Sequence, residues 1–474
     1  MTTALKIIVN SLKKYDNKWI GTPAVCHFKS DNLNFENLLN YDQIFIRDFV
    51  PVALLFLIKN TLPPKREESQ EIEINGKEIV YNFLNVTLKM HQEARQKKFN
   101  SLVLMPASFK VHSEGELQYL EPDFGDRAIA RVTPVDSSLW WIILLRAYCQ
   151  AVGNNSLAHR EDFQECIRLI LALYFVDRLD MEPTLLVPDG ACMIDRRMGI
   201  YGYPLEIQVL FYAALRSAWE LLPDIKTNQT IRQTIKNRLH TLKQHLQEHY
   251  WLDFKRLNDI YRFKVEQYGK DVNNKFNLYS DSIPYTWLSE WLGENCGYLA
   301  GNIGPFQLDC RFFTLGNLMA IISGLTTRWQ AHQLMNLIQH QWHKLIAQMP
   351  IKICYPALTG RDWEIITGCD PKNKQWSYHN GGSWPVLIWF LAAATLKLER
   401  EDIIQKLKVD LIKIGDRLAG EDWPEYYDGE DGNLIGKEAR KYQTWSIAGF
   451  LLAQELLENP QYLALIDFAF DGDN

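Results

Sequence analysis

Helical periodicity constrains this sequence more than any other feature. Apolar residues recur at three- and four-residue spacing, the pattern of a helix with a buried face. The segments that show it clearly are 138–152, 160–180, 204–222, 227–250, 311–324, 328–348, 384–398, 401–418 and 441–457. Weaker patterns predict helices near 36–60, 81–98 and 284–296. About twelve helices and few strands place the chain in the all-α class.

Helix-start signals support these ranges. Asp136 or Ser137 stands where an N-cap residue is expected before the apolar run SLWWIILL, because a short oxygen-bearing side chain can accept from the first free N–H groups. Pro204 and Pro385 stand in first turns, where the missing N–H of proline has no cost. These positions predict where the helices begin.

Strand signals are sparse, and nothing marks a domain boundary. The best strand signal is EIEINGKEIV (71–80), whose Asn-Gly pair predicts a hairpin turn, and the preceding PPKREESQ has the composition of a polar loop. Because no linker and no fixed repeat is visible, we expect one domain over residues 1–474, with a loop-rich insertion near 61–130. A closed double ring of helices, an (α/α)6 barrel, fits better than a solenoid. Such a ring gathers alternate loops around one pocket.

Composition and charge exclude several other classes of function. With 51 basic and 57 acidic residues the net charge is −6, which argues against nucleic acid as a partner. The longest apolar runs are far short of a membrane span. The eight cysteines include no C-x-x-C pair and no cluster has metal-ligand spacing, so no metal and no cofactor is expected. The N-terminus is too polar for a signal peptide, and we expect a cytoplasmic protein.

Five connecting segments are rich in acids, arginines, amides and aromatic rings. They are YDQIFIRDFVP, RVTPVDSSLWW, MIDRRMGIYGYPLE, ALTGRDWEIITGCDPKNKQWSYHNGGSWP and WPEYYDGEDG. Acids and amides hydrogen-bond sugar hydroxyls, and aromatic rings pack on the C–H faces of sugars, so this content is typical of a carbohydrate site. The candidate substrate-binding residues are Arg47, Asp48, Asp136, Trp140, Arg196, Tyr201, Arg361, Asp362, His379, Asn380, Tyr426 and Arg440.

Several of these candidates also have an ordinary structural explanation. Asp136 is placed to cap a helix, Arg47 and Asp48 are placed to form a local ion pair, and Trp140 stands at a helix start where tryptophan is often core. His379 precedes two glycines, a pattern that fits either a buried histidine or a backbone that approaches a ligand closely. The residue pattern alone leaves these alternatives open.

Several long motifs resemble those of one enzyme family. The segments DRRMGIYGYPLEIQ, RVTPVDSSLWW, GNIGPFQLDCRFFTLGN, CYPALTGRDWEIITGCDPKN, WSYHNGGSWPV and WPEYYDG are similar to those of the alkaline/neutral invertases, cytosolic sucrose hydrolases of plants and cyanobacteria. The resemblance runs from about residue 30 to 457. It implies an (α/α)6 barrel, inverting hydrolysis of sucrose to glucose and fructose, and a tendency to form homo-oligomers.

The resemblance also implies two catalytic carboxylates, with Asp195 as general acid and Glu425 as general base. Asp189 is the nearest rival for the acid, and Glu421 and Asp422 are rivals for the base. An inverting pair is separated by about 6.5–9.5 Å, and the acid must hold its proton near neutral pH. Two alternatives are kept: another inverting α-glucosidase, such as a trehalase-like enzyme, and a non-catalytic sugar-binding protein.

Overall fold

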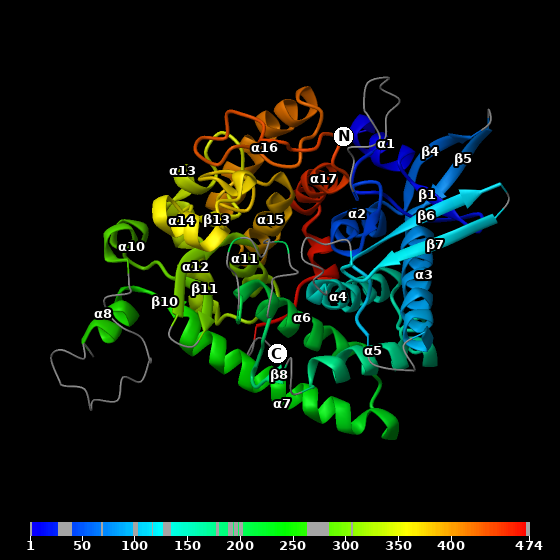
Figure 1. Ribbon diagram of the computed structural model, residues 1–474, viewed down its shortest axis with the longest axis horizontal. Helices are drawn as coiled ribbons and strands as arrows, with labels where there is room; N and C mark the ends of the chain where they lie inside the picture. The colour runs from blue at the N-terminus through cyan, green and yellow to red at the C-terminus, as the bar shows by residue number, and fades with distance from the viewer. Residues whose placement is uncertain are drawn as a thin grey trace.

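Helices arranged around a common centre make up most of the molecule, and β-hairpins project from one side (Figure 1). The computed structural model describes residues 2–26, 40–67, 70–97, 103–115, 117–126, 134–176, 180–187, 193, 198, 202–262, 284–304 and 307–470. The all-α class predicted from periodicity is confirmed, since the long elements are helical and the strands are short.

Six helices pack on one another in a closed ring. They are α2 (Ile46–Lys59), α4 (Val135–Val152), α6 (Leu205–Leu221), α11 (Thr314–Ile322), α15 (Ile388–Lys397) and α17 (Thr444–Glu458). Helix α2 contacts α4, α4 contacts α6, α6 contacts α11, α11 contacts α15, α15 contacts α17, and α17 returns to α2. Their labels surround the middle of Figure 1.

The composition of these ring helices explains why they lie inside. In α2 every residue from Phe49 to Ile58 is buried, and in α15 every residue from Ile388 to Thr395 is buried. A helix that is apolar on all sides must be covered on all sides. The core therefore runs through the ring and includes large side chains such as Trp141 and Phe56.

Other helices cover the outside of the ring. They are α1 (Thr2–Asn10), α3 (Gly76–Lys97), α5 (Glu161–Tyr174), α7 (Gln229–His245), α12 (Arg328–His340) and α16 (Glu401–Gly420). Helix α16 shows the pattern, because Ile403, Leu407, Leu411, Ile414 and Leu418 are buried at helical spacing while the opposite face is exposed. Such a one-sided helix covers a core and leaves its polar face in solvent.

The strands form small antiparallel sheets between the helices. They are β1 (Lys13–Tyr15) with β2 (Lys18–Gly21); β3 (Ile44–Phe45) with β6 (Ser108–Glu114) and β7 (Leu117–Asp123); β4 (Thr61–Glu67) with β5 (Gln70–Asn75); β8 (Asp180–Met181) with β9 (Thr184–Leu185); and β10 (Trp251–Leu252), β11 (Tyr298–Gly304), β12 (Gln307–Phe313) and β13 (Cys354–Tyr355) in that order.

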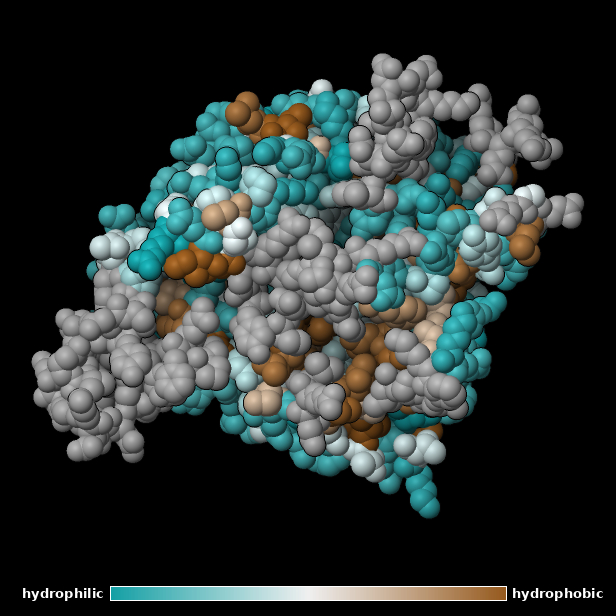
Figure 2. Space-filling model, in the orientation of Figure 1, coloured by the Kyte–Doolittle hydropathy of each residue, from teal (hydrophilic) through white to brown (hydrophobic). Residues whose placement is uncertain are grey.

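Short helical pieces complete the described chain. They are η3 (Lys226–Asn228), η4 (Leu246–Tyr250), α8 (Phe254–Arg262), α10 (Tyr285–Trp291), α13 (Trp342–Leu345), α14 (Gly360–Thr367), η6 (Pro371–Asn373), η7 (Pro385–Leu387) and η8 (Pro460–Leu465). On the face shown in Figure 2, hydrophobic side chains are visible near the middle, over the part of the ring where α4 and α6 lie.

The hairpin predicted at the Asn-Gly pair is wrong. Asn75 ends strand β5, and helix α3 begins at Gly76. The Asn75 side chain accepts a hydrogen bond from the N–H of Glu78 at 3.1 Å, so it caps the helix. The partner strand β4 is the stretch expected to be a polar loop. Asparagine is common both in hairpin turns and at helix N-caps. The local sequence therefore does not decide which of the two structures Asn75 forms.

Several predicted boundaries also need correction. Helix α4 begins at Val135 with Pro134 as its N-cap, so Asp136 lies inside the first turn and neither Asp136 nor Ser137 is the N-cap. The helix predicted over 160–180 ends at Tyr174, and the one over 328–348 is interrupted at Gln341. The region near 61–130, expected to be loop-rich, contains two hairpins and the long helix α3.

The C-terminal segment lies against the C-terminal ends of the ring helices. The N–H of Phe468 donates to the carbonyl of Ile322 in α11. Arg146 of α4, Arg216 of α6 and Lys397 of α15 donate to carbonyls of residues 465–469. The tail thus ties together four helices at the end of the ring opposite to their first turns.

Candidate active site

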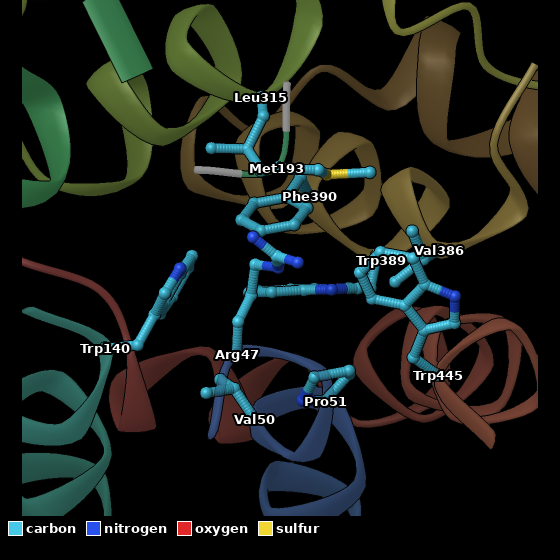
Figure 3. A pocket seen from close by; sticks show the side chains of 10 residues that line it. All are labelled: Arg47, Val50, Pro51, Trp140, Met193, Leu315, Val386, Trp389, Phe390 and Trp445. Carbon is cyan, nitrogen blue, oxygen red and sulfur yellow. The ribbon is translucent and has the colours of Figure 1, made fainter. Parts of the chain in front are cut away.

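A pocket lies where the first turns of the ring helices meet. It is a hollow of about 280 Å³, part of it open to solvent. Its lining comes from the beginnings of α2, α4, α11, α15 and α17, from η7, and from one residue ahead of α6. The lining residues are Arg47, Val50, Pro51, Trp140, Met193, Leu315, Val386, Trp389, Phe390 and Trp445 (Figure 3). First turns of helices that are distant in sequence therefore meet at one place.

Arg47 is the charged centre of this pocket. Its side chain rises from α2 into the middle of the view in Figure 3, and its guanidinium is 5.9 Å from the ring centroid of Trp445. Its Nε donates to Asp48 at 3.3 Å and its Nη1 donates to Asp136 at 2.9 Å. The local ion pair expected for Arg47 and Asp48 is thus part of a larger network between α2 and α4.

Burial raises the pKa of both carboxyl groups in this network, and the charge of Arg47 opposes the rise. Burial would lower the pKa of Arg47, but the charges of Asp136 and Asp48 outweigh it and raise that pKa. The positive charge of Arg47 therefore stabilises the ionised forms of Asp48 and Asp136, which burial has removed from solvent. These fixed charges are suited to bidentate hydrogen bonding of a polar ligand.

Three tryptophans surround the arginine. Trp140 lies on one side of it in Figure 3, and Trp389 and Trp445 lie on the other. All three side chains are buried, and within the described part of the chain none of their indole N–H groups has a hydrogen-bond partner. Buried donors without an acceptor are costly. The three side chains themselves belong to the lining of the hollow.

Glu206, in the first turn of α6, connects this pocket to the segment that precedes the helix. Its Oε1 accepts from the backbone N–H of Met193 at 2.8 Å, and its charge acts on Arg47. The predicted acid and its neighbours lie outside the described residues, and so does the rival acid: they are Asp189, Asp195, Arg196, Arg197 and Tyr201. Their roles remain predictions.

Glu425 lies in the connection between α16 and α17 and is 4% exposed. Its Oε1 accepts from the hydroxyl of Tyr41 at 3.1 Å, and its Oε2 lies 3.4 Å from the backbone N–H of Arg440. Burial raises the pKa of this carboxyl above its ordinary value, whereas the charge of Lys372 and the hydrogen bond from Tyr41 act in the opposite direction. The rivals are placed differently, since Glu421 pairs with Arg417 and Asp422 pairs with Lys441.

Tyr41 and Lys372 were not among the candidates from the sequence, although both lie in the five connecting segments. The Lys372 amine lies 3.8 Å from the ring centroid of Tyr378, and its charge reaches Glu425. Asp48 also acts on Glu425 and raises its pKa further. This last effect links the Glu425 group with the Arg47 network. Tyr41 is separated from Glu425 by 384 positions, so no local pattern pointed to their contact.

The aromatic residues that follow Glu425 are part of the scaffold. Tyr426 stacks on Trp384 at 5.4 Å, and its hydroxyl donates to the carbonyl of Lys437. Tyr427 faces the other way, 4.7 Å from the guanidinium of Arg417. Both tyrosines have no exposed surface. Tyr426, predicted to bind substrate, is therefore placed where it fixes the loop, and its contact with substrate remains a prediction.

Gly381 and Gly429 allow two loops to touch. A Cβ atom on Gly429 would lie 1.7 Å from the carbonyl oxygen of Gly381, and Gly381 itself has a φ of +89°. The N–H of Gly429 donates to the carbonyl of Trp376 at 2.7 Å. The sequence indicated that the backbone at Gly381 lies close to another group. In the structure this group is the loop that carries Glu425.

His379 and Asn380 lie in the same loop and are both buried. The ring of His379 stacks on Tyr378 at 4.0 Å. The side chain of Asn380 accepts from the N–H of Leu358 and donates to the carbonyls of Leu358 and Asn373. Asn380 therefore uses its amide to hold loop backbone. Direct contact of either residue with substrate stays a prediction.

The remaining predicted residues lie on the edge of this region. Arg361 and Asp362 are exposed in the first turn of α14, and the charge of Asp362 acts on Arg311. Arg440 is half-buried, and its guanidinium lies 5.4 Å from the ring centroid of Tyr41. The structure thus brings Arg440 next to the Glu425 group and leaves Arg361 and Asp362 in solvent.

No group of three or more His, Cys, Asp or Glu side chains within the described ranges is placed to hold a metal ion. Among the helices that the structure describes, none combines the length and the apolar content that crossing a membrane requires.

Comparison with known proteins identifies the family. The model of a family described as alkaline and neutral invertase matches residues 4–460. A rice cytosolic invertase 1 is 49% identical over 475 residues, covering 99% of this chain and 80% of its own. A probable chloroplastic alkaline/neutral invertase A from Arabidopsis thaliana is 50% identical over 467 residues, covering 97% and 70%.

A solved structure supports the fold. A GH63 mannosylglycerate hydrolase from Thermus thermophilus, in complex with glucose, superposes with a TM-score of 0.52 and 11% identity, covering 96% of this chain and 99% of its own. At that identity the likeness concerns the fold alone. The resemblance seen in the sequence motifs is confirmed: the chain belongs to the alkaline and neutral invertase family of glycoside hydrolases.

Proposed function

We propose that this protein hydrolyses sucrose to glucose and fructose with inversion at the glucosyl carbon, with Glu425 as general base and Asp195 as general acid. The observation that carries the proposal is the placement of Glu425. It is a buried carboxylate, held by two hydrogen-bond donors, within electrostatic reach of the Arg47 network. Relatives of the same family that are about half identical carry the name invertase.

The fold that we infer is an (α/α)6 barrel. Along the chain, outer and ring helices alternate from α1 and α2 to α16 and α17, and the six ring helices close on themselves. In such a barrel the connections that lead into the inner helices lie at one end. This agrees with a pocket lined by the first turns of the ring helices.

The chemistry follows from the two proposed roles. Glu425 takes a proton from a water molecule as its oxygen attacks the anomeric carbon of the glucosyl unit. The bond from that carbon to the bridging oxygen breaks, and Asp195 gives its proton to the departing fructosyl oxygen. One water is consumed, and each carboxyl returns to its initial state by exchanging a proton with solvent. The product is β-glucose, because the water enters opposite to the departing group.

The raised pKa of Glu425 is compatible with this role. A base works best when its pKa lies near the working pH, provided that it is ionised there. Burial strengthens the carboxylate as a base, while Tyr41 and Lys372 limit the rise. The opposite requirement applies to Asp195, which must remain protonated.

The pocket around Arg47 offers what a sugar requires. Indole faces of Trp140, Trp389 and Trp445 suit the C–H faces of a pyranose ring. The carboxylates of Asp48 and Asp136 accept from hydroxyl groups. We assign the glucosyl unit to this pocket.

Cytoplasmic location and homo-oligomer formation remain predictions. The names of the relatives include cytosolic, mitochondrial and chloroplastic proteins, so the family does not fix the compartment. Gel filtration with light scattering measures the oligomeric state.

The test is a panel of sucrose, trehalose, maltose and raffinose with the purified protein, followed by NMR of fresh product. We expect sucrose to be the preferred substrate and β-glucose to appear before α-glucose. Turnover of trehalose without sucrose would favour the trehalase-like alternative, and no turnover of any sugar would favour a binding protein. Initial α-glucose would exclude inversion.

A further inference from the structure

Tyr41 reaches the catalytic region from the N-terminal part of the chain. Its backbone carbonyl accepts from the N–H of Val25 at 3.1 Å. The N–H of Cys26 in turn donates to the carbonyl of Tyr442 at 2.9 Å, and Val25 forms an isolated antiparallel bridge with Gln443. Backbone hydrogen bonds therefore fix Tyr41 against the segment that leads into α17.

The same segment holds Glu425. The N–H of Glu425 donates to the carbonyl of Arg440 at 2.8 Å, and the guanidinium of Arg440 covers the ring of Tyr41 at 5.4 Å. Tyr41 and Glu425, whose side chains meet at 3.1 Å, are thus both fixed to the segment that leads into α17. The backbone of each residue is therefore held in place by hydrogen bonds.

A hydrogen bond at this position affects both orientation and charge. The Tyr41 hydroxyl donates to Oε1, so it stabilises the ionised carboxylate and restricts its rotation. Each carboxylate oxygen has two lone pairs, so each can accept a further hydrogen bond from a water molecule. The hydroxyl oxygen of Tyr41 can itself accept from that water. Burial, followed by the charge of Glu425, raises the pKa of Tyr41 well above its ordinary value, so the hydroxyl keeps its proton.

The other charges that face Glu425 come from several elements. Lys372 in η6 stabilises the carboxylate, and Asp48 in α2 destabilises it. Arg440, in the connection before α17, supplies a backbone N–H at 3.4 Å. Among these groups Tyr41 makes the shortest contact between a side chain and a Glu425 oxygen.

We propose that Tyr41 is a positioning residue for hydrolysis: it orients the Glu425 carboxylate toward the attacking water and keeps it ionised. This inference rests on the proposed role of Glu425 as general base. It adds a residue that was not among the candidates from the sequence, and it joins the N-terminal part of the chain to the reaction.

The test compares Tyr41→Phe with Tyr442→Phe. Phenylalanine keeps the ring of Tyr41 and removes only the donor. The hydroxyl of Tyr442 bonds Asp422 at 2.9 Å instead of Glu425, so it is a matched control. For Tyr41→Phe we expect kcat to fall by about 10- to 100-fold, the range of a hydrogen bond to a charged group, with KM nearly unchanged.

The pH profile separates positioning from a purely structural role. Loss of the donor raises the pKa of Glu425, so the acidic limb of kcat/KM should move to higher pH by about one unit. Tyr442→Phe should leave that limb in place. A Tyr41→Phe protein that is folded by circular dichroism and shows an unchanged limb and kcat would overturn the inference.

Two further measurements keep the outcomes distinct. Tyr41→His retains a ring that can donate, and we expect it to recover part of the lost kcat; it also serves if Tyr41→Phe folds poorly. Glu425→Gln tests the proposed function itself. If Glu425→Gln is inactive while Tyr41→Phe behaves like wild type, only the role of Tyr41 fails. If Glu425→Gln stays active, the proposed base is wrong whatever Tyr41 does.

Discussion

The backbone of Arg440 contacts both the backbone and the side chain of Glu425. The N–H of Glu425 donates to the carbonyl of Arg440 at 2.8 Å, and the N–H of Arg440 lies 3.4 Å from Oε2 of Glu425. The proposed base is therefore held by main chain as well as by Tyr41. Such a carboxylate is ordered before substrate arrives, which lowers the cost of reaching the reactive arrangement.

Replacing Glu425 with Gln should lower kcat by about 10²–10⁴-fold, the cost of removing a general base, and stabilise the fold. Because burial raises the pKa of Glu425, the folded state binds its proton more tightly than the unfolded state does, and stability falls as pH rises above the ordinary Glu value of about 4.3. The neutral amide removes this cost, so the midpoint of thermal unfolding at pH 7 should rise.

The control for this change is Glu421→Gln, since Glu421 pairs with Arg417 at the end of α16. It should leave kcat within about twofold and should not raise the midpoint, because a half-exposed ion pair contributes little. Equal loss of activity in both variants would contradict the assignment of Glu425.

Lys372→Met should shift the activity profile without altering the maximum. The Lys372 charge lowers the pKa of Glu425 against the larger effect of burial, so its removal raises that pKa. Activity should then be lost first at low pH and retained at high pH. The difference from wild type should shrink in high salt, since Lys372 is half-buried and its charge is screened.

Lys374→Met is the matched control, because Lys374 is exposed two residues away. We expect its profile to follow that of wild type at every salt concentration. A shift of the same size in both variants would indicate a general loss of positive charge instead of a specific effect of Lys372 on Glu425.

Arg47→Met should destabilise the protein in a pH-dependent way. It leaves the Asp48 and Asp136 carboxylates without their cation, and breaking a buried pair costs about 3–5 kcal/mol. The pKa of both carboxyls, already raised by burial, rises further. The loss of stability should therefore be small near pH 4 and should grow toward pH 8.

Thermal unfolding across that pH range measures the effect. Arg160→Met is the control, because Arg160 pairs with Asp162 on the surface, where such pairs contribute about 0–1 kcal/mol. A pH-independent loss in Arg47→Met would mean that packing of the arginine stem, and not the two carboxylates, determines the cost.

The helices of the ring were predictable because their own composition determines their place. Runs such as VPVALLFLI have no polar face, so they can only be covered on all sides. The Asn75–Gly76 pair was not predictable in the same way, since the choice between a turn and a helix cap depends on the strand that pairs with it, β4. The ends of α5 at Tyr174 and of α12 at His340 also lie beside residues that are distant in sequence. The hydroxyl of Tyr174 donates to the carbonyl of Val135, and the side chain of Gln341 donates to the carbonyl of Trp291.

For the site, the sequence identified residues whose type is unusual for their segment. Glu425 among aromatic residues and Arg47 before an apolar helix are of this kind, and the structure places Arg47 at the centre of the pocket. Tyr41, Trp389 and Trp445 were missed, because an aromatic residue at a helix start or in a loop is usually core. The three-dimensional structure is needed to show that Trp389 and Trp445 line a hollow and that Tyr41 contacts a carboxylate.

Gly429→Ala should reduce activity through the loop that carries Glu425. The new Cβ would lie 1.7 Å from the carbonyl oxygen of Gly381, a backbone atom that cannot turn aside, so the two loops must separate. A displacement of about 1 Å at a catalytic group costs about 10²-fold in rate. Gly420→Ala is the control, since its Cβ would meet nothing within 4 Å; it should keep wild-type kcat.

Phe468→Ala should destabilise the fold while leaving catalysis intact. Phe468 is 2% exposed, its ring lies 3.9 Å from the Arg146 guanidinium, and its N–H bonds the end of α11. Loss of a buried phenylalanine costs about 3–5 kcal/mol. Because it lies at the end of the ring opposite to the first turns that form the pocket, KM and kcat of the folded fraction should not change.

Denaturant unfolding and steady-state kinetics test this pair of expectations. Phe254→Ala is the control, since Phe254 is 39% exposed and its removal should change the midpoint little. If Phe468→Ala lowers kcat as much as it lowers the midpoint, the two ends of the ring are coupled, and the tail affects the geometry of the pocket. If neither changes, the tail packs on the ring without stabilising it.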